Sequence, residues 1–227
     1  MFWLSECLFC HNYVYRLKDG RLKCSTCHKK TSIKKINKIL FLIECYVNNK
    51  STLEASKLLQ ISYISAKEYY HTFRVISAKI CEEQYLSLRE KKCDYDEYYY
   101  LEASKQKEKQ AVFDAHNFLT FDYEGHIYTI LMPSLQKYKQ QFLHDNLAET
   151  YLTEFHAFKR RHKIIKLSTH HNKIVDFWNY FEKQITHYKG ITDEYFPYYL
   201  KEFEFKYNHS KEHSFTLLVQ NYFKEDT

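Results

Sequence analysis

The sequence has few of the residues that build linkers. Its 227 residues include only three glycines and two prolines, whereas flexible or extended linkers are rich in Gly, Ser or Pro. It also has no long hydrophobic run. The longest, Ile39–Ile43, ends at Glu44, well short of the roughly 20 apolar residues that span a bilayer. We therefore expect neither a long linker nor a membrane-spanning segment.

A secretory signal is missing as well. The apolar stretch Met1–Leu4 is too short for one, and the acidic Glu6 follows closely. We therefore expect a cytoplasmic protein, in a compartment where thiols stay reduced. The seven cysteines of the chain then need an explanation other than disulfide bonds.

Four of the cysteines form two Cys-x-x-Cys pairs, Cys7 with Cys10 and Cys24 with Cys27, and 13 residues separate the pairs. This spacing is close to that of zinc ribbons, although slightly shorter than is usual for them. Each pair can point two thiolates at one ion, and two pairs complete a tetrahedral site. A site closed by four thiolates has no open position for chemistry, so we expect a structural zinc ion.

The residues between the two pairs predict a β-hairpin. Tyr13–Leu17 and Arg21–Lys23 have strand character, and Lys18–Gly20 supplies an Asp-Gly turn. His11 and His28 are competing zinc ligands, but each directly follows a cysteine and is redundant. The remaining cysteines are isolated and are expected in the core: Cys45, Cys81 and Cys93.

The middle of the chain predicts a series of helices. Apolar residues recur at the helical period over Ile36–Tyr46, and Ser51 or Thr52 can cap a following helix. After a turn at Gln60–Ser62, a longer helix is predicted over Tyr63–Ile80. The apolar residues expected to face inward in these last two helices are Leu53, Leu58, Leu59, Ile64, Tyr69, Phe73, Ile76 and Ile80.

Helix, tight turn, helix is the pattern of a helix-turn-helix DNA-binding motif. An ordinary helical hairpin is the alternative, because the turn lacks a glycine. For a DNA-binding motif, the residues at the start of the recognition helix are Ser62, Tyr63, Ser65, Lys67 and Tyr70. The net charge of +6 is compatible with a polyanionic partner. Basic residues that would add phosphate contacts, if they are not simply solvated, are Lys34, Lys35, Arg160 and Arg161.

From Lys91 onward the pattern changes to strands. Three antiparallel strands, a helix, a strand, another strand and helices follow one another, which is the order of a ribonuclease-H-like domain. In that fold the first strand meets the fourth, so Asp96 and Glu154 come together. The predicted strands are Cys93–Tyr100, Gln110–Ala115, His126–Leu131, Glu149–Thr153 and Lys163–Leu167, and the predicted helices are Ser134–Phe142, Lys173–Tyr188 and Asp193–Tyr207. A turn over Asp122–Gly125 is expected between the second and third strands.

The first of these strands is unusually acidic. Because side chains alternate on a strand, Asp94 and Asp96 project to one face and Glu97 to the other. Two like charges on one face repel unless a positive charge lies near them. A divalent cation is one candidate for that charge, and a solvated edge strand is the alternative.

Three segments resemble parts of a known family: Asp94–Tyr99, Gly125–Pro133 and Ile174–Asn179. The first is similar to that family's strand with the pattern Asp-x-Asp-Glu followed by two aromatic residues. The second is similar to the family's second hairpin, and the third to its segment with the pattern Ile-Glu-Asn-Phe-Trp. The family is that of bacterial insertion-sequence transposases with an N-terminal zinc ribbon and a ribonuclease-H-like domain. The likeness continues through Lys189–Ile191 and Leu200–Asn208 and covers nearly the whole chain.

The resemblance implies a triad of two aspartates and a third residue, Glu or Asn, that holds two magnesium or manganese ions. Carried over, Asp96 is the first member, Glu154 stands where a second aspartate is expected, and Asp176 stands at the third position, where the family has Glu or Asn. Such ions prefer oxygen ligands and act as a pair in phosphodiester cleavage. Glu154 departs from the family because it is one methylene longer than Asp. Side chains expected to support the triad are Asp94, Glu97 and Lys183.

The sequence therefore predicts an α+β, multidomain protein. A zinc ribbon is expected over residues 1–33, a helix-turn-helix region over 34–90, and a ribonuclease-H-like domain with C-terminal helices over 91–227. The leading hypothesis is a nucleoid-associated transposase that binds double-stranded DNA at element ends and target, at least as a homodimer, and cleaves and joins strands. The alternatives are a catalytically decayed, zinc-containing DNA-binding protein and a zinc-ribbon module for protein interaction.

Overall fold

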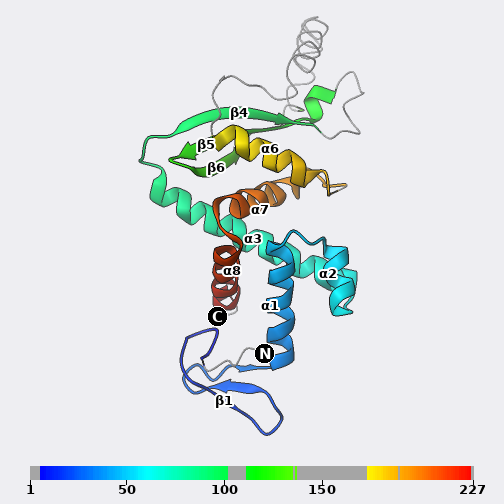
Figure 1. Ribbon diagram of the computed structural model, residues 1–227, viewed down its shortest axis with the longest axis vertical. Coiled ribbons are helices and arrows are strands. Elements are labelled where there is room, and N and C mark those ends of the chain that lie inside the picture. The colour runs from blue at the N-terminus through cyan, green and yellow to red at the C-terminus, as the bar shows by residue number, and fades with distance from the viewer. Residues whose placement is uncertain (1–5, 102–110, 135, 137–172, 189, 226–227) are drawn as a thin grey trace, which may run out of the picture. The chain divides into compact units, whose positions relative to one another are not determined.

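The computed structural model describes residues 6–101, 111–134, 136, 173–188 and 190–225 (Figure 1). These residues form six α-helices and two three-stranded antiparallel sheets. The mixed α+β class predicted from the sequence is therefore confirmed. Several predicted features lie outside the described residues: Glu154, Arg160, Arg161, the strands Glu149–Thr153 and Lys163–Leu167, and nearly all of the helix Ser134–Phe142.

The chain divides into two compact units. The first combines Met1–Glu83 with Lys201–Thr227, and the second is Gln84–Leu200. Residues 201–227 thus belong to the same unit as the N-terminal third of the chain. The three domains expected over 1–33, 34–90 and 91–227 stay a prediction.

The first unit begins with a small sheet of three strands in the order β1-β2-β3. Tyr15 lies opposite Lys23, which confirms the predicted hairpin and its turn. The elements of this unit are β1 (Val14–Arg16), β2 (Leu22–Cys24), β3 (Lys30–Thr31), α1 (Ile33–Val47), α2 (Thr52–Leu59), most of α3 (Tyr63–Leu88), most of α7 (Phe196–Asn208) and α8 (Lys211–Glu225).

Helix α2 starts at a full capping box. The Ser51 hydroxyl accepts a hydrogen bond from the Glu54 backbone N–H, and the Glu54 carboxylate accepts one from the Ser51 backbone N–H. The helix ends at Gln60, which takes a left-handed conformation. Because the small residues Ala55 and Ser56 face the core, the helix approaches its neighbours closely. The predictions that Leu53, Leu58 and Ile64 face inward are wrong, since all three are exposed.

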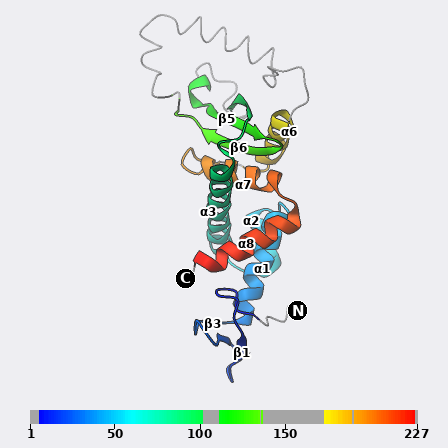
Figure 2. The same ribbon diagram turned by 90° about the vertical axis from the view of Figure 1, so that its left-hand side faces the viewer.

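Helix α8 was not anticipated from the sequence. It packs beside α1 (Figure 2), and its Leu218 and Phe223 join a core that also holds Ile39 and Tyr46. Ser210 begins the helix, because its hydroxyl accepts a hydrogen bond from the His213 backbone N–H. The C-terminal segment thereby supplies part of the first unit's core.

A buried ion network links α3 to α7 inside this unit. Glu202 is fully buried, and its carboxylate lies 2.6 Å from Arg74 Nε and 2.5 Å from Lys206 Nζ. The Lys206 ammonium also donates to Asn49 Oδ1 and lies 4.0 Å from the centroid of the Tyr46 ring. Although burial raises the pKa of Glu202, the two cations outweigh it and hold that pKa below its usual value.

The second unit contains a sheet in the order β4-β5-β6, covered on one face by a helix (Figure 1). Tyr98 of the sheet packs on Phe118 and on Trp178 of that helix. The elements are β4 (Asp94–Tyr100), a 3₁₀ turn (Ala111–Asp114), β5 (His116–Tyr123), β6 (His126–Leu131), α6 (Lys173–Ile185), the start of α7 and the end of α3.

The second strand of this sheet was predicted too early in the chain. Within the segment predicted as a strand, Gln110–Ala115, the described residues Ala111–Asp114 form a 3₁₀ turn, and β5 runs from His116 to Tyr123. The turn before β6 is shorter than expected: only Glu124 and Gly125 make it, both with positive φ. A two-residue turn of this kind suits the twist of a hairpin, and it lengthens β5 into the region expected to be a turn.

Within the described parts of the chain, no helix is both long enough and apolar enough to cross a membrane.

The buried network predicts a strong effect of one conservative substitution. Glu202→Gln leaves the Arg74 and Lys206 cations buried with only a neutral partner, so the free energy of unfolding should fall by about 3–5 kcal/mol. Because the folded pKa of Glu202 is below its unfolded value, its contribution is present above about pH 4.3 and is lost as the pH falls further. Urea denaturation between pH 3 and 7 checks both statements. The exposed Glu82→Gln is the control, and equal stability of the two variants would contradict the prediction.

Candidate functional site

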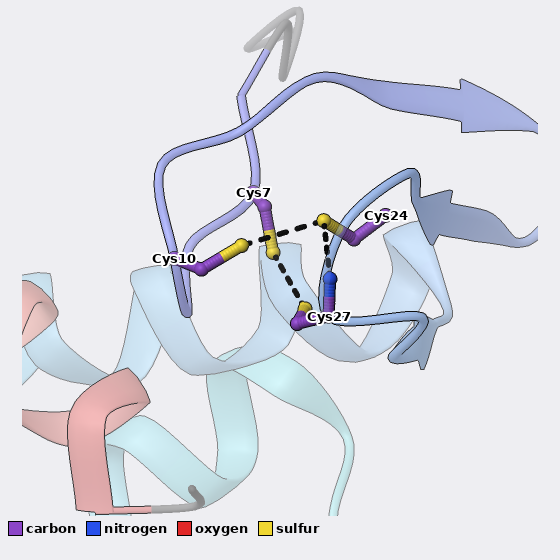
Figure 3. Close-up of side chains that lie close together, drawn as sticks. All are labelled: Cys7, Cys10, Cys24 and Cys27. Atoms are coloured by element: carbon purple, nitrogen blue, oxygen red, sulfur yellow. Dashed lines mark hydrogen bonds between the residues drawn. The ribbon is translucent and has the colours of Figure 1, made fainter.

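The four cysteines of the two Cys-x-x-Cys pairs converge at the base of the β1–β2 hairpin (Figure 3). The Sγ atoms of Cys7 and Cys27 are 3.6 Å apart, and those of Cys10 and Cys24 are 3.4 Å apart. All four sulfur atoms lie within 4.8 Å of one another. A tetrahedral site with Zn–S bonds of 2.3 Å requires sulfur atoms about 3.8 Å apart, so the cluster can hold a zinc ion.

The backbone of each pair forms the same kind of turn. His11 and His28 directly follow Cys10 and Cys27, and both have a φ of 58°, a conformation that is uncommon without glycine. Both histidines are exposed and do not belong to the ligand cluster. The cysteines, and not the histidines, therefore form the cluster that could hold a metal ion.

The thiols of the cluster have divergent acidities. A hydrogen bond to the Asn12 backbone is the main reason that the pKa of Cys10 falls to about 6. The Lys29 backbone lowers the pKa of Cys27, but burial and the neighbouring thiols outweigh it and raise that pKa to about 12. Four thiols this close cannot all ionise unless a cation balances them. A zinc ion would supply that charge.

The second candidate site lies on β4. Asp96 is on the same face of the strand as Tyr98, whose ring centroid is 4.9 Å from that of Trp178. Directly opposite Asp96 on β5 is Thr120, whose hydroxyl accepts a 2.9 Å hydrogen bond from Trp178 Nε1. Asp96 therefore lies on the face of the sheet that α6 covers.

Partial burial is the main cause of a raised pKa at Asp96. The Glu97 backbone N–H, which donates to Asp96 Oδ1 at 2.8 Å, acts in the opposite direction. The nearby Glu97 carboxylate raises the pKa further. A cation beside Asp96 would stabilise its charged form.

The other acidic residues of β4 have separate surroundings. Glu97 points to the opposite face, where its Oε1 accepts a 2.7 Å hydrogen bond from Asn117 Nδ2. Asp94 is exposed and lies opposite Asp122 in the register, so Asp122 shares the face of Asp94 and Asp96. The sequence had assigned Asp122 to a turn, and its Oδ1 does accept a hydrogen bond from the Gly125 backbone N–H.

Asp176 does not project toward Asp96. It is exposed on α6, about 160° around the helix from the buried Trp178 at 3.6 residues per turn. Lys183 lies two turns farther along the same outward stripe and is also exposed. The acidic residue of α6 that does reach β4 is Glu182, which accepts a hydrogen bond from the Tyr98 hydroxyl and was missed from the sequence. Within the described residues, the four cysteines are the only group of three or more potential ligands close enough to share an ion.

The candidate DNA-contact residues around α3 divide into two groups. Ser62, Tyr63 and Lys67 are exposed, and the Ser62 hydroxyl accepts a hydrogen bond from the Ser65 backbone N–H at 3.0 Å, as at a helix start. Tyr70 does not fit the contact role, because its side chain is 1% exposed and its hydroxyl donates to the Lys50 carbonyl. The basic residues Lys34 and Lys35 are exposed on the first turn of α1.

Comparison with known proteins gives one distant relative. No family model and no solved structure matches the chain. An "Uncharacterized transposase-like protein" from Haemophilus influenzae (strain ATCC 51907 / DSM 11121 / KW20 / Rd) is 26% identical over 102 residues, which cover 37% of this chain and 83% of that protein.

The cysteine cluster predicts about one zinc ion per chain. Cys7→Ser removes one of four thiolates, so the purified variant should lose most of its zinc, whereas His11→Ala and His28→Ala should keep it. Elemental analysis by mass spectrometry measures the zinc content, and circular dichroism monitors the fold. Folded wild-type protein without zinc, or Cys7→Ser with undiminished zinc, would refute this assignment.

Proposed function

We propose that the protein is the transposase of an insertion sequence, which binds double-stranded DNA at the element's ends and at the target and uses divalent metal ions to cut and join strands. The observation that carries the proposal is the placement of Asp96. It lies on the first strand of an antiparallel three-stranded sheet, on the face covered by α6. This is the position expected for the first carboxylate of a ribonuclease-H-like transposase, and the transposase-like relative supports the same family.

The arrangement of the sheet leaves room for the rest of such a domain. Within the described residues, β4 pairs with β5 along one edge only. In the proposed fold, the strand expected over Glu149–Thr153 pairs along the other edge of β4. That pairing would bring Glu154 toward Asp96.

Asp96 fits a magnesium or manganese ion in its ligand chemistry, since such ions prefer carboxylate oxygens. Asp94 and Asp122 share its face but are not close enough to form a ligand group with it. When bound, a pair of these ions would activate the attacking oxygen and stabilise the leaving one in phosphodiester cleavage. The protein's own part is to hold the carboxylate in place. Thr120 and Trp178, joined by a hydrogen bond, fix the strand and helix on either side of it.

The DNA-binding part of the proposal rests on α2 and α3. The turn between them is closed by Gln60 in a left-handed conformation, and α3 presents Tyr63 and Lys67 to solvent at its start. In a helix-turn-helix protein, the N-terminal residues of the second helix contact base edges in the major groove. The four-cysteine cluster, as a closed zinc site, would stabilise the hairpin that precedes these helices.

A second function is favoured by the orientation of Asp176. Since this side chain lies on the outward stripe of α6, it is poorly placed to share an ion with Asp96. A decayed transposase that keeps its zinc site and binds DNA without cutting it would tolerate that arrangement. Transposition needs two ends held together, so the active form requires at least a dimer.

The catalytic proposal predicts that Asp96→Asn abolishes DNA cleavage. The substrate is a supercoiled plasmid with the DNA that flanks the protein's own gene, and cleavage is measured by gel with Mg²⁺ or Mn²⁺. Loss of a metal ligand should lower the rate at least about a hundredfold while leaving DNA binding intact. Glu124→Gln, an exposed change in the β5–β6 turn, is the control.

Asp176→Asn separates the two functions further. If this variant still cuts, Asp176 is not the third ligand; if it does not, Asp176 belongs to the site. Wild-type protein that cuts no better than Asp96→Asn would leave the DNA-binding alternative as the function.

The DNA-binding proposal predicts that Lys67→Gln weakens binding to duplex DNA of any sequence. Loss of one phosphate contact should also reduce the slope of log Kd against log salt by about 1. Tyr63→Ala should weaken binding to the element's own ends more than binding to unrelated DNA, because a base contact carries specificity. Fluorescence anisotropy at several salt concentrations measures both effects. Lys79→Gln, exposed farther along the same helix, serves as control, and equal effects at positions 67 and 79 would disfavour the motif.

A further inference from the structure

The sheet beside the cysteine cluster has two chemically different faces. Val14 lies opposite Cys24, and Leu22 lies opposite Thr31, so the apolar residues and the metal-ligating cysteine share one face. On the other face, Lys23 lies opposite Tyr15 on one side and opposite Lys30 on the other. A tyrosine and two lysines thus form a row across all three strands, directed away from the side chain of Cys24.

The lysine pair is unfavourable by itself. Like charges held directly opposite one another on neighbouring strands destabilise a sheet, and no carboxylate bridges Lys23 and Lys30 among the ion pairs of the described residues. The one ion pair within the hairpin joins Arg21 to Asp19 in the turn. An anionic group placed over the row would contact both ammonium groups and relieve their repulsion.

Two tyrosine rings extend this face along β1. Tyr13 and Tyr15 are two residues apart, so they project from the same face, and they are 67% and 38% exposed. Exposed rings beside cations suit unpaired bases, since bases stack on aromatic side chains while lysines contact the phosphates. The acidic residues near this face are the exposed Glu6, which forms an isolated bridge with Tyr13, and Asp19, which interacts electrostatically with Lys30.

The charge of the surrounding segment has the same sign. Residues 6–31 contain six lysines and arginines against Glu6 and Asp19. A zinc ion held by four thiolates would have a net charge of −2, but Lys23 and Lys30 lie on the sheet face opposite to that of Cys24. The position of these two lysines is therefore not explained by compensation of the negative charge of the zinc-bound cluster.

We infer that this outward face, made by Tyr13, Tyr15, Lys23 and Lys30, binds single-stranded DNA. Duplex DNA offers the phosphates but keeps its bases stacked in pairs, so it cannot use the two rings in the same way. The inference goes beyond the proposed function, which assigns duplex binding to α3 and strand cleavage to Asp96. A single strand bound at the hairpin requires neither of those activities.

The test measures binding of a fluorescent 20-nucleotide oligothymidine to the full-length, zinc-loaded protein by anisotropy. Tyr13→Ala/Tyr15→Ala should raise Kd at least about tenfold, because a stacked base is worth that much or more, and Tyr13→Phe/Tyr15→Phe should bind within about twofold of wild type. Lys23→Gln/Lys30→Gln should reduce the salt slope by about 1.4, as expected for two contacts to a single strand. Tyr195→Ala, a 42% exposed tyrosine of the second unit, is the matched control, and zinc content verifies that each variant is folded.

Two further probes separate this inference from the proposed function. Binding of a 20-base-pair duplex should be unchanged by the tyrosine pair and weakened by Lys67→Gln, so failure of either site is recognised independently. An oligothymidine affinity that the tyrosine pair does not change, or no oligothymidine binding by wild-type protein at low salt, would overturn the inference. Tighter binding of oligouridine than of oligothymidine would overturn its assignment to DNA.

Discussion

Successive side chains of a strand point to opposite faces, and this alternation determines which residues meet at the candidate site of each sheet. In the first sheet, Val14 and Cys24 share the face of the metal cluster, while Tyr15 and Lys23 point the other way. In the second, Tyr98 and Asp96 share the face that α6 covers, and Glu97 pairs with Asn117 on the other face. A shift of the register of either sheet by one residue would exchange its two sets of residues and remove the candidate site of that sheet.

The structural features that could be predicted from the sequence are those that a few neighbouring residues determine. The two Cys-x-x-Cys pairs with the Asp-Gly turn between them were enough to place the hairpin and the ligand cluster. Of the two candidate caps of α2, Ser51 and Thr52, Ser51 is the one that caps the helix. What the sequence could not show depends on contacts between distant segments. Leu53 and Leu58 belong to the exposed face of α2 because Ala55 and Ser56 occupy the contact. In the same way, Glu182 and Tyr98 are 84 residues apart, and no local pattern connects them.

The candidate catalytic site was predicted in part for the same reason. The face of Asp96 follows from strand alternation alone, whereas the outward direction of Asp176 depends on how α6 turns its apolar side to the sheet. Trp178 fixes the rotation of α6 about its own axis. Its indole N–H needs a hydrogen-bond partner inside the core, and the Thr120 hydroxyl is that partner. The aromatic residue that made the segment recognisable thus also determines which acidic residues of the helix reach β4.

The buried Glu202 has a consequence for the order in which the protein becomes functional during synthesis. Arg74 and the core around Tyr46 leave the ribosome long before the segment that includes Glu202, Lys206 and Phe223. Until then the nascent α3 has neither this counter-charge nor the apolar cover that α8 provides. The unit that contains α2 and α3 therefore completes its core only after the ribosome has translated the strands of the second unit. A nascent chain still lacking residues 201–227 would therefore be without part of the first unit's core and without the counter-charge of Arg74.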